Sequence, residues 1–419
     1  MMRLNLRTPA RRWAAAAALV AVTTGYCGLA TCRLLASHLA ITADAPLLQR
    51  AIQLDPGNAE YRHEAGIHEL ANQSPRTAVT WLQSAVRLNP HAAKYWMDLA
   101  VAQELMDNSA GERASIESAL AVDPHTPEIA WQAANLFLAE GLADKAMPQF
   151  RTVLENDPPL TGQAITTAWK IQPDVDALLE KVVPPAADVP FLQFLAAKNE
   201  TAAAEKVWAR IFALQQPVSR TDMLEYERYL LSHQEVSQAA LVWQQAAKLS
   251  DIEAYQPSPE NLIINGDFSL DVLNGGFDWV HAPSRGVTVA LDPSETHSSS
   301  RSLRITLDGS EISDAGISQV VMVEPNARYD FAAFYKAKAM KGAGAMHFAI
   351  QDAYRATPLF LSDDLTNADF WKNAGGSFVT SPETRLVRVH IVRDPPGRPI
   401  RGKLWIDGLR LVQGGTEPR

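Results

Sequence analysis

The chain has 419 residues, a formal net charge of −9 and a hydrophobic content of 47%. Its length exceeds what one hydrophobic core usually organises, so two or more domains are expected. The hydrophobic content is that of a folded protein and excludes a largely disordered chain. The acidic body lacks the basic surface that phosphate recognition needs, which argues against a nucleic-acid partner.

Residues 13–32 form an uncharged segment of twenty residues. At about 1.5 Å per residue, it is long enough to cross roughly 30 Å of hydrocarbon. The flanking charges are asymmetric, with only Arg33 close behind the segment and four arginines before it: Arg3, Arg7, Arg11 and Arg12. The positive-inside tendency therefore predicts a cytoplasmic basic segment at 1–12 and a transmembrane signal anchor at 13–32. The chain would be a single-pass protein of the inner (cytoplasmic) membrane, with its bulk exported to the periplasm or the cell exterior.

Two alternatives to a retained anchor stay open. The alanine-rich segment could end in a small-residue cleavage site, as signal peptides do. Leu29-Ala30-Thr31-Cys32 is similar to a lipoprotein processing site, although Thr31 departs from the usual pattern. Both cysteines, Cys27 and Cys32, lie inside this segment, so the exported part can form neither a disulfide nor a thiolate zinc site.

The chain then repeats itself every 34 residues. An Asp-Pro or Asn-Pro pair closes each unit at Pro56, Pro90, Pro124 and Pro158. Proline ends a helix because it lacks an amide and disfavours the helical region for its predecessor. Small residues recur in phase at Gly66, Ala100 and Ala134, and large apolar residues recur at Leu82, Ile116 and Phe150. The pattern resembles tetratricopeptide repeats, which predicts an α-solenoid of stacked helix pairs over 45–158.

The repeat continues imperfectly at both ends. Only a second helix, Ala45 to Leu54, is expected in the first unit, because its first helix would overlap the membrane segment. Beyond Pro158 the phase weakens, yet Trp208 and Trp243 stand 35 residues apart in similar surroundings. Degenerate helical repeats are therefore predicted over 159–250.

The tetratricopeptide resemblance implies a protein partner bound along the face made by the first helices. By the phase of the repeat, this groove would present His63, Ile67, Met97, Val101, Trp131 and Asn135. Apolar residues at helical spacing also suit packing between repeats, so Met97 and Trp131 have a second interpretation as core. We interpret His63 as a surface residue rather than a metal ligand.

The helical pattern stops near Pro257 and Pro259, which predicts a linker at 251–260. Short alternating runs follow, separated by Gly, Pro, Asp and Asn, as in an antiparallel β-sandwich. Strands are predicted at 287–291, 302–307, 317–323, 329–336, 346–351, 385–392 and 404–411. The chain is thus expected to be a multidomain α plus β protein.

The C-terminal domain, residues 261–413, resembles the CenC-like carbohydrate-binding modules, which are galactose-binding-like jelly rolls. The similarity rests on ordered motifs: Asn265-Gly266-Asp267-Phe268, Gly276-Phe277-Asp278-Trp279, His297-Ser298, Trp371, and a closing Leu404-Trp405-Ile406-Asp407. It implies polysaccharide or oligosaccharide binding and a structural calcium held by Asp267 and Asp407, with no other cofactor. Calcium prefers such carboxylate oxygens, but Gly408 replaces a second acid often found there.

Sugar binding needs aromatic faces for pyranose rings and polar groups for hydroxyls. The candidates are Gln351, Asp352, Tyr354, Phe370, Trp371 and Asn373. We interpret the adjacent acids Asp363 and Asp364 as a solvated turn, and no known catalytic motif appears in the exported region. The hypothesis is a non-enzymatic envelope protein accessory to polysaccharide assembly or export. The alternative is a purely structural adaptor whose jelly roll binds no sugar.

Overall fold

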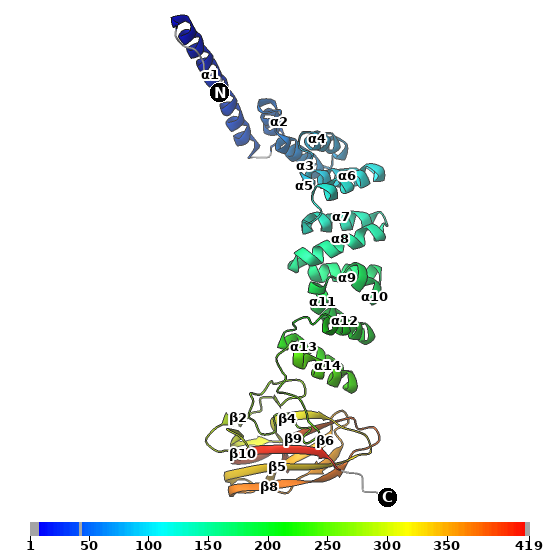
Figure 1. Cartoon of the computed structure of the whole chain (residues 1–419), viewed down its shortest axis with the longest axis vertical. Coiled ribbons are helices and arrows are strands. Elements are labelled where there is room, and N and C mark those ends of the chain that lie inside the picture. The colour runs from blue at the N-terminus through cyan, green and yellow to red at the C-terminus, as the bar shows by residue number, and fades with distance from the viewer. Residues whose placement is uncertain (1–7, 42–43, 415–419) are drawn as a thin grey trace. The chain divides into compact units, whose positions relative to one another are not determined.

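The computed structural model describes residues 8–41 and 44–414, so Arg3 and Arg7 of the predicted basic segment lie outside the described residues. The chain divides into two compact units, Met1–Phe194 and Leu195–Arg419. Helices make up the first unit and the start of the second, and two antiparallel sheets follow (Figure 1). The predicted fold class, a helical array followed by a β-sandwich, is confirmed.

The first unit begins with a long apolar helix, α1 (Pro9–Ala40), of 32 residues. It is long and apolar enough to cross a membrane. Its large apolar side chains, among them Trp13, Leu19 and Tyr26, are exposed.

The end of α1 packs on α2 (Ala45–Leu54). Ala36 of α1 and Ala51 of α2 are both fully buried in a small cluster with Tyr61. The expectation that the first unit has only a second helix is therefore wrong. The helix predicted for the membrane runs on to Ala40, and its last turns occupy the place of the missing first helix.

Three helix pairs follow, and each pair packs most closely within itself. Their bounds are α3 Ala59–Ala71, α4 Pro75–Leu88, α5 Ala93–Glu104, α6 Ser109–Val122, α7 Pro127–Ala139 and α8 Ala143–Asn156. The large apolar positions Leu82, Ile116 and Phe150 have no exposed surface, and neither do Ala100 and Ala134. The phase assigned from the sequence is confirmed.

Gly66 shows why a small residue is needed where two helices meet. A Cβ atom built at Gly66 would lie 2.5 Å from Cγ of Leu82, far inside van der Waals contact. We expect Gly66→Ala to lower the free energy of unfolding by about 1–3 kcal/mol through overpacking. Urea unfolding of the full chain measures this.

The matched control is Gly162→Ala. Gly162 lies in the first turn of α9 with open space at its missing Cβ, so alanine should not lower the free energy of unfolding. Equal effects at the two glycines would contradict the close contact with Leu82.

Of the remaining helices, α9 to α11 are shorter than the repeat helices, whereas α12 to α14 have 13 or 14 residues each. Their bounds are η1 Pro158–Leu160, α9 Thr161–Ile171, α10 Val175–Lys181, η2 Pro185–Ala187, α11 Asp188–Ala197, α12 Thr201–Ala213, α13 Arg220–Ser232 and α14 Val236–Leu249. Both short 3-10 turns begin at prolines, which explains the loss of phase after Pro158.

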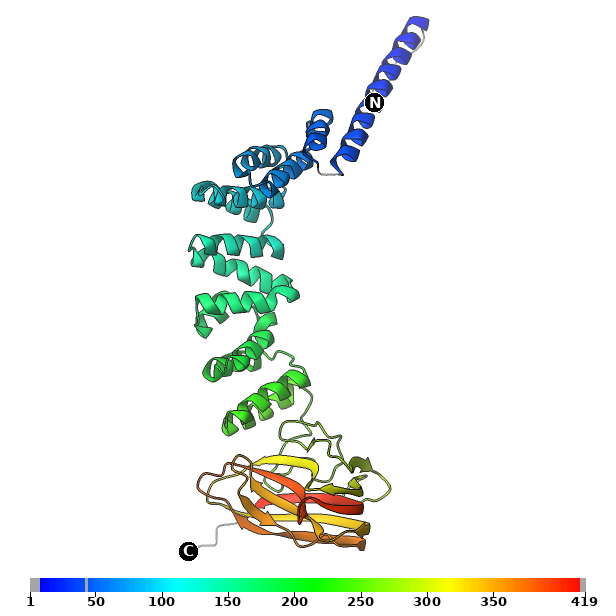
Figure 2. The ribbon, with the colours of Figure 1, turned by 180° about the vertical axis from the view of Figure 1, so that it is seen from behind.

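The sandwich consists of two five-stranded antiparallel sheets, in the orders β1-β4-β9-β6-β7 and β2-β3-β10-β5-β8. Their packing as two layers is visible from behind in Figure 2. The strands are β1 Val280–His281, β2 Val287–Asp292, β3 Ser302–Ile312, β4 Asp314–Met322, β5 Arg328–Lys341, β6 Ala345–Asp352, β7 Pro358–Leu361, β8 Ala368–Val379, β9 Leu386–Asp394 and β10 Arg398–Gln413. Trp279, Phe348 and Ile406 are among the fully buried residues between the sheets. All seven predicted strands are present, whereas β1, β7 and β8 were not predicted.

Within the second unit, the last helix pair packs on the sandwich through Trp243. Trp208 on α12 stacks on Tyr226 with ring centroids 5.5 Å apart, as neighbouring repeats do. At the equivalent position on α14, Trp243 meets Phe277 of the sandwich edge-on at 5.9 Å and donates a 2.7 Å hydrogen bond to the Tyr255 carbonyl. The sandwich thus covers the last tryptophan as a further repeat would.

Gly276 permits this close approach. Its φ of +63° is one that side chains rarely adopt, and a Cβ there would lie 1.9 Å from the Trp243 ring. Only glycine suits both the conformation and the space.

Candidate functional site

An aromatic cluster lies on the outer face of the sheet that contains β8. On β5, Phe331, Ala333 and Tyr335 point into the core, so the alternate residue Phe334 points outward. The His297 ring stacks on Phe334 at 3.8 Å between centroids, and Trp371 of β8 lies 5.5 Å from His297. Trp371 and Phe334 are half-buried and His297 is exposed, so the cluster is accessible to a ligand.

The loop between β2 and β3 holds His297 in this position. The backbone amides of His297 and Ser298 donate to Oδ2 of Asp407, at 2.7 and 2.8 Å. Asp407 lies on β10 and is fully buried. A carboxylate that accepts two amides fixes a loop firmly, because each charge-assisted bond is stronger than a neutral one.

Charged residues on the same face are paired. Glu295 contacts Lys336 at 2.6 Å and Lys338 at 2.8 Å, and these hydrogen bonds lower the pKa of its carboxyl. Lys338 also lies over the ring of Trp405, 5.6 Å from its centroid. Trp405 is opposite Lys336 in register and therefore belongs to the outer face, where it is buried under this charged layer.

A polar hollow with a volume of about 440 Å³ adjoins β8. Asn373 lines it from β8, opposite Phe334 in register. Asp363 and Asp364 line it from the segment before β8. Gly375 and Gly376 complete the wall without side chains. Phe331 and Tyr335, which point into the core from β5, also line the hollow, so it lies on the inner side of β8, whereas the aromatic cluster lies on the outer face.

The structure does not bring the six predicted sugar residues together. Phe370, Trp371 and Asn373 lie on β8, and Phe370 is 83% exposed. Gln351 and Asp352 end β6, in the other sheet. The sequence prediction did not include His297 and Phe334 as neighbours of Trp371 and Asn373, because strand β8 itself was not predicted.

At the end of β6 and in the turn after it, the side chains of Asp352 and Tyr354 form hydrogen bonds within the fold. Oδ1 of Asp352 accepts the amides of Tyr354 and Arg355, and its Oδ2 accepts the Thr384 hydroxyl. The Tyr354 hydroxyl donates to the Leu231 carbonyl of α13 at 2.8 Å. These bonds shape the turn after β6 and hold it against the last helix pair.

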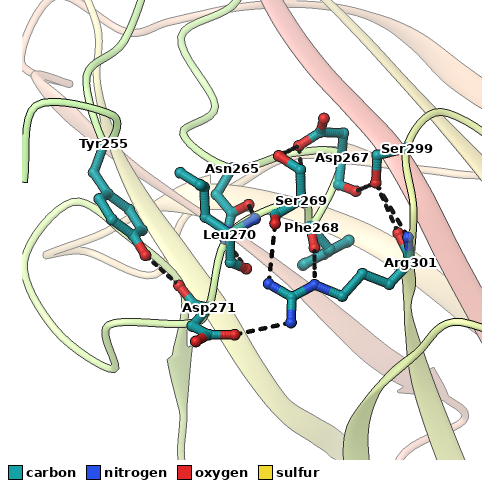
Figure 3. Close-up of polar contacts among 9 residues, drawn as sticks. All are labelled: Tyr255, Asn265, Asp267, Phe268, Ser269, Leu270, Asp271, Ser299 and Arg301. Carbon is teal, nitrogen blue, oxygen red and sulfur yellow. Dashed lines mark hydrogen bonds and ion pairs between the residues drawn. The ribbon is translucent and has the colours of Figure 1, made fainter.

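At Asp267, one of the two residues of the implied calcium site, the surrounding loop does not fit the ion. The Arg301 guanidinium already occupies the loop after Asp267, donating to the carbonyls of Phe268 and Ser269 and pairing with Asp271 at 2.9 Å (Figure 3). Oδ1 of Asp267 accepts two bonds from Ser269. Calcium takes six to eight oxygens, and a guanidinium beside it would repel it. In this loop the positive charge comes from Arg301.

The predicted partner groove differs in accessibility from one residue to the next. His63 is 1% exposed and Met97 is fully buried, so the interpretation of His63 as a surface residue is wrong. Ile67, Val101 and Trp131 are half-buried and Asn135 is exposed. The four accessible residues remain the predicted contacts of a partner.

No family model matches the chain, and no curated protein matches it. Among solved structures, the crystal structure of MamA protein is 16% identical over 37% of this chain and 87% of its own, with a TM-score of 0.31. YrrB, described as a TPR protein with an unusual peptide-binding site, is 20% identical over 34% and 84%, with a TM-score of 0.27. A structure described as "CBM4 structure and function" is 15% identical over 36% and 99%, with a TM-score of 0.28. All three scores are below 0.5, so the fold assignment rests on the helices and strands themselves.

Proposed function

We propose that the chain is a non-enzymatic, membrane-anchored scaffold of the cell envelope, in which the helical repeats hold a protein partner and the jelly roll contacts a glycan along β8. The anchor would be α1 in the inner membrane, with the bulk of the chain exported. Its accessory role would be in assembly or export of a polysaccharide. The charge asymmetry around residues 13–32 supports this orientation.

One observation carries the glycan part of the proposal. The aromatic cluster of Trp371, His297 and Phe334 lies on the outer face of its sheet, where Asn373 is opposite Phe334 in register and supplies an amide on the same face. The loop anchored on Asp407 holds the cluster in place before any ligand arrives. A preorganised surface of this kind loses little side-chain entropy on binding.

The test begins with the full chain, purified in detergent, on a glycan array, followed by calorimetric titration of the glycan that binds. We expect Trp371→Ala to weaken binding more than tenfold, which is about 1.4 kcal/mol, because a stacking face is lost. The midpoint of thermal unfolding should change little, since Trp371 is only half-buried.

Tyr354→Ala is the matched control. Tyr354 is another partly exposed aromatic residue, but its hydroxyl bonds to α13, away from β8. Its replacement should leave the glycan affinity at the parental value. Loss of binding in Tyr354→Ala with full binding in Trp371→Ala would move the site to the turn after β6.

A second candidate function is a structural adaptor. The packing of Phe277 and Gly276 on Trp243 favours it, because the jelly roll there covers the last helix pair as another repeat would. An adaptor needs no sugar. Failure of the parental chain to bind any glycan on the array would favour this second function.

A further inference from the structure

A group of metal-ligating side chains lies on α3, far in sequence from the glycan site. Glu60, His63 and Glu64 each offer a donor atom within 4.8 Å of the other two. They stand at positions i, i+3 and i+4, which share one face of a helix. This spacing is present in the sequence itself.

His63 has a buried nitrogen without a partner. The side chain is 1% exposed, and its Nδ1 accepts or donates no hydrogen bond within the described residues. Oε1 of Glu64 is 3.7 Å from Nδ1. Leaving a buried polar atom unpaired is costly, so this nitrogen is placed for a ligand.

The other nitrogen of the ring is already held. Nε2 lies 2.6 Å from Oδ2 of Asp98, which α5 supplies from the next repeat. A neutral imidazole that donates Nε2–H to a carboxylate keeps its lone pair on Nδ1, which is the form that binds metals. The carboxylate–histidine pair therefore orients His63 for a cation on the Nδ1 side.

Tyr95 of α5 supports the same group. Its ring stacks on His63 at 4.4 Å between centroids, and its hydroxyl donates to Oε2 of Glu60. Two residues of α5 thus hold two of the three donor residues of α3.

We propose that Glu60, His63 and Glu64 form a zinc site at the contact between α3 and α5. Zinc binds imidazole nitrogen and carboxylate oxygen at about 2.0–2.2 Å in tetrahedral sites, which places donors roughly 3.3 Å apart. His63 is fixed, whereas Glu60 is exposed and Glu64 is half-buried, so the two carboxylates can close on the ion. Three protein ligands leave the fourth position to water.

Calorimetric titration of the full chain with zinc chloride tests the proposal, using protein without a histidine tag and stripped with EDTA. We expect one zinc per chain and a rise in the midpoint of unfolding, because the ion binds only the folded arrangement. Glu64→Gln should weaken binding at least tenfold while keeping the fold, since this side chain is near the surface. Asp98→Asn should weaken it 10- to 100-fold through the orientation of His63.

His68→Gln is the matched control, on the same helix. His68 bonds to Asn72 through Nδ1 and takes no part in the cluster, so zinc affinity should stay parental. Three results would overturn the proposal: no zinc binding by the parental chain, parental affinity in Glu64→Gln, or an equal loss in His68→Gln.

Discussion

Trp243→Ala should lower the free energy of unfolding of the second unit by about 3–5 kcal/mol, the usual cost of removing a large buried aromatic side chain. Trp243 is 2% exposed and is among the largest buried side chains of the chain. The change removes the contact with Phe277 and leaves the Tyr255 carbonyl without its donor. Both losses fall where the helix pair meets the sandwich.

Trp208→Ala is the comparison that separates this contact from general destabilisation. Trp208 is equally buried, but it stacks on Tyr226 and donates to Gln245, both within the helices. Hydrogen exchange read by mass spectrometry should show faster exchange at 273–279 in Trp243→Ala only. Faster exchange of that segment in both variants, or in neither, would mean that Trp243 does not join the two parts.

Glu227→Gln should stabilise the second unit at alkaline pH. Glu227 lies on α13 with 1% of its surface exposed, and its Oε1 has no hydrogen-bond partner among the described residues. Burial raises the pKa of its carboxyl to about 8, against a small opposing effect of Arg228. The folded state therefore keeps a proton that the unfolded state releases near pH 4.5.

The sign of the pH dependence follows from this raised pKa. Between about pH 4.5 and pH 8 the unfolded state binds fewer protons than the folded state, so stability falls as the pH rises. The loss is complete above about pH 8, where it is on the order of 5 kcal/mol, and glutamine does not suffer it. Variant and parent should thus be similar near pH 4.5 and diverge by pH 9.

Urea unfolding at a series of pH values measures the difference. Asp278 also makes stability fall as the pH rises, since burial raises its pKa to about 7. It is present in both the variant and the parent, so its contribution cancels when their stabilities are compared. Glu225→Gln, at an exposed position on the same helix, is the control and should follow the parent. Parallel stability curves for Glu227→Gln and the parent would show that Glu227 is not buried in solution.

The helical repeats were predictable because their signals are local and periodic. Proline stops and in-phase small residues such as Ala100 report the same packing in each unit. The inner strands were predictable for a similar reason, since β5 alternates buried and exposed residues along most of its length. Strict alternation is what one buried face of a sheet demands.

The candidate sites were less predictable because their signals are not local. Strand β8 is an edge strand whose residues are mostly exposed, and Gly375 and Gly376 weaken its β propensity. The sequence therefore indicated Trp371 as a single aromatic residue but not its contact with His297. His297 comes from a loop 74 positions earlier in the chain. Asp98 is likewise 35 positions from His63 and meets it only once α3 and α5 pack.

The contact at Trp243 also decides where the chain can be divided. Residues 251–260 resemble a linker in composition, yet Ile252 within them is fully buried and Tyr255 bonds to both Trp243 and Asp271. A fragment that starts at Pro257 would expose Phe277 and lose the tryptophan that covers it. A protease should therefore find this segment resistant, and the smallest piece that keeps the jelly roll intact should begin before α13.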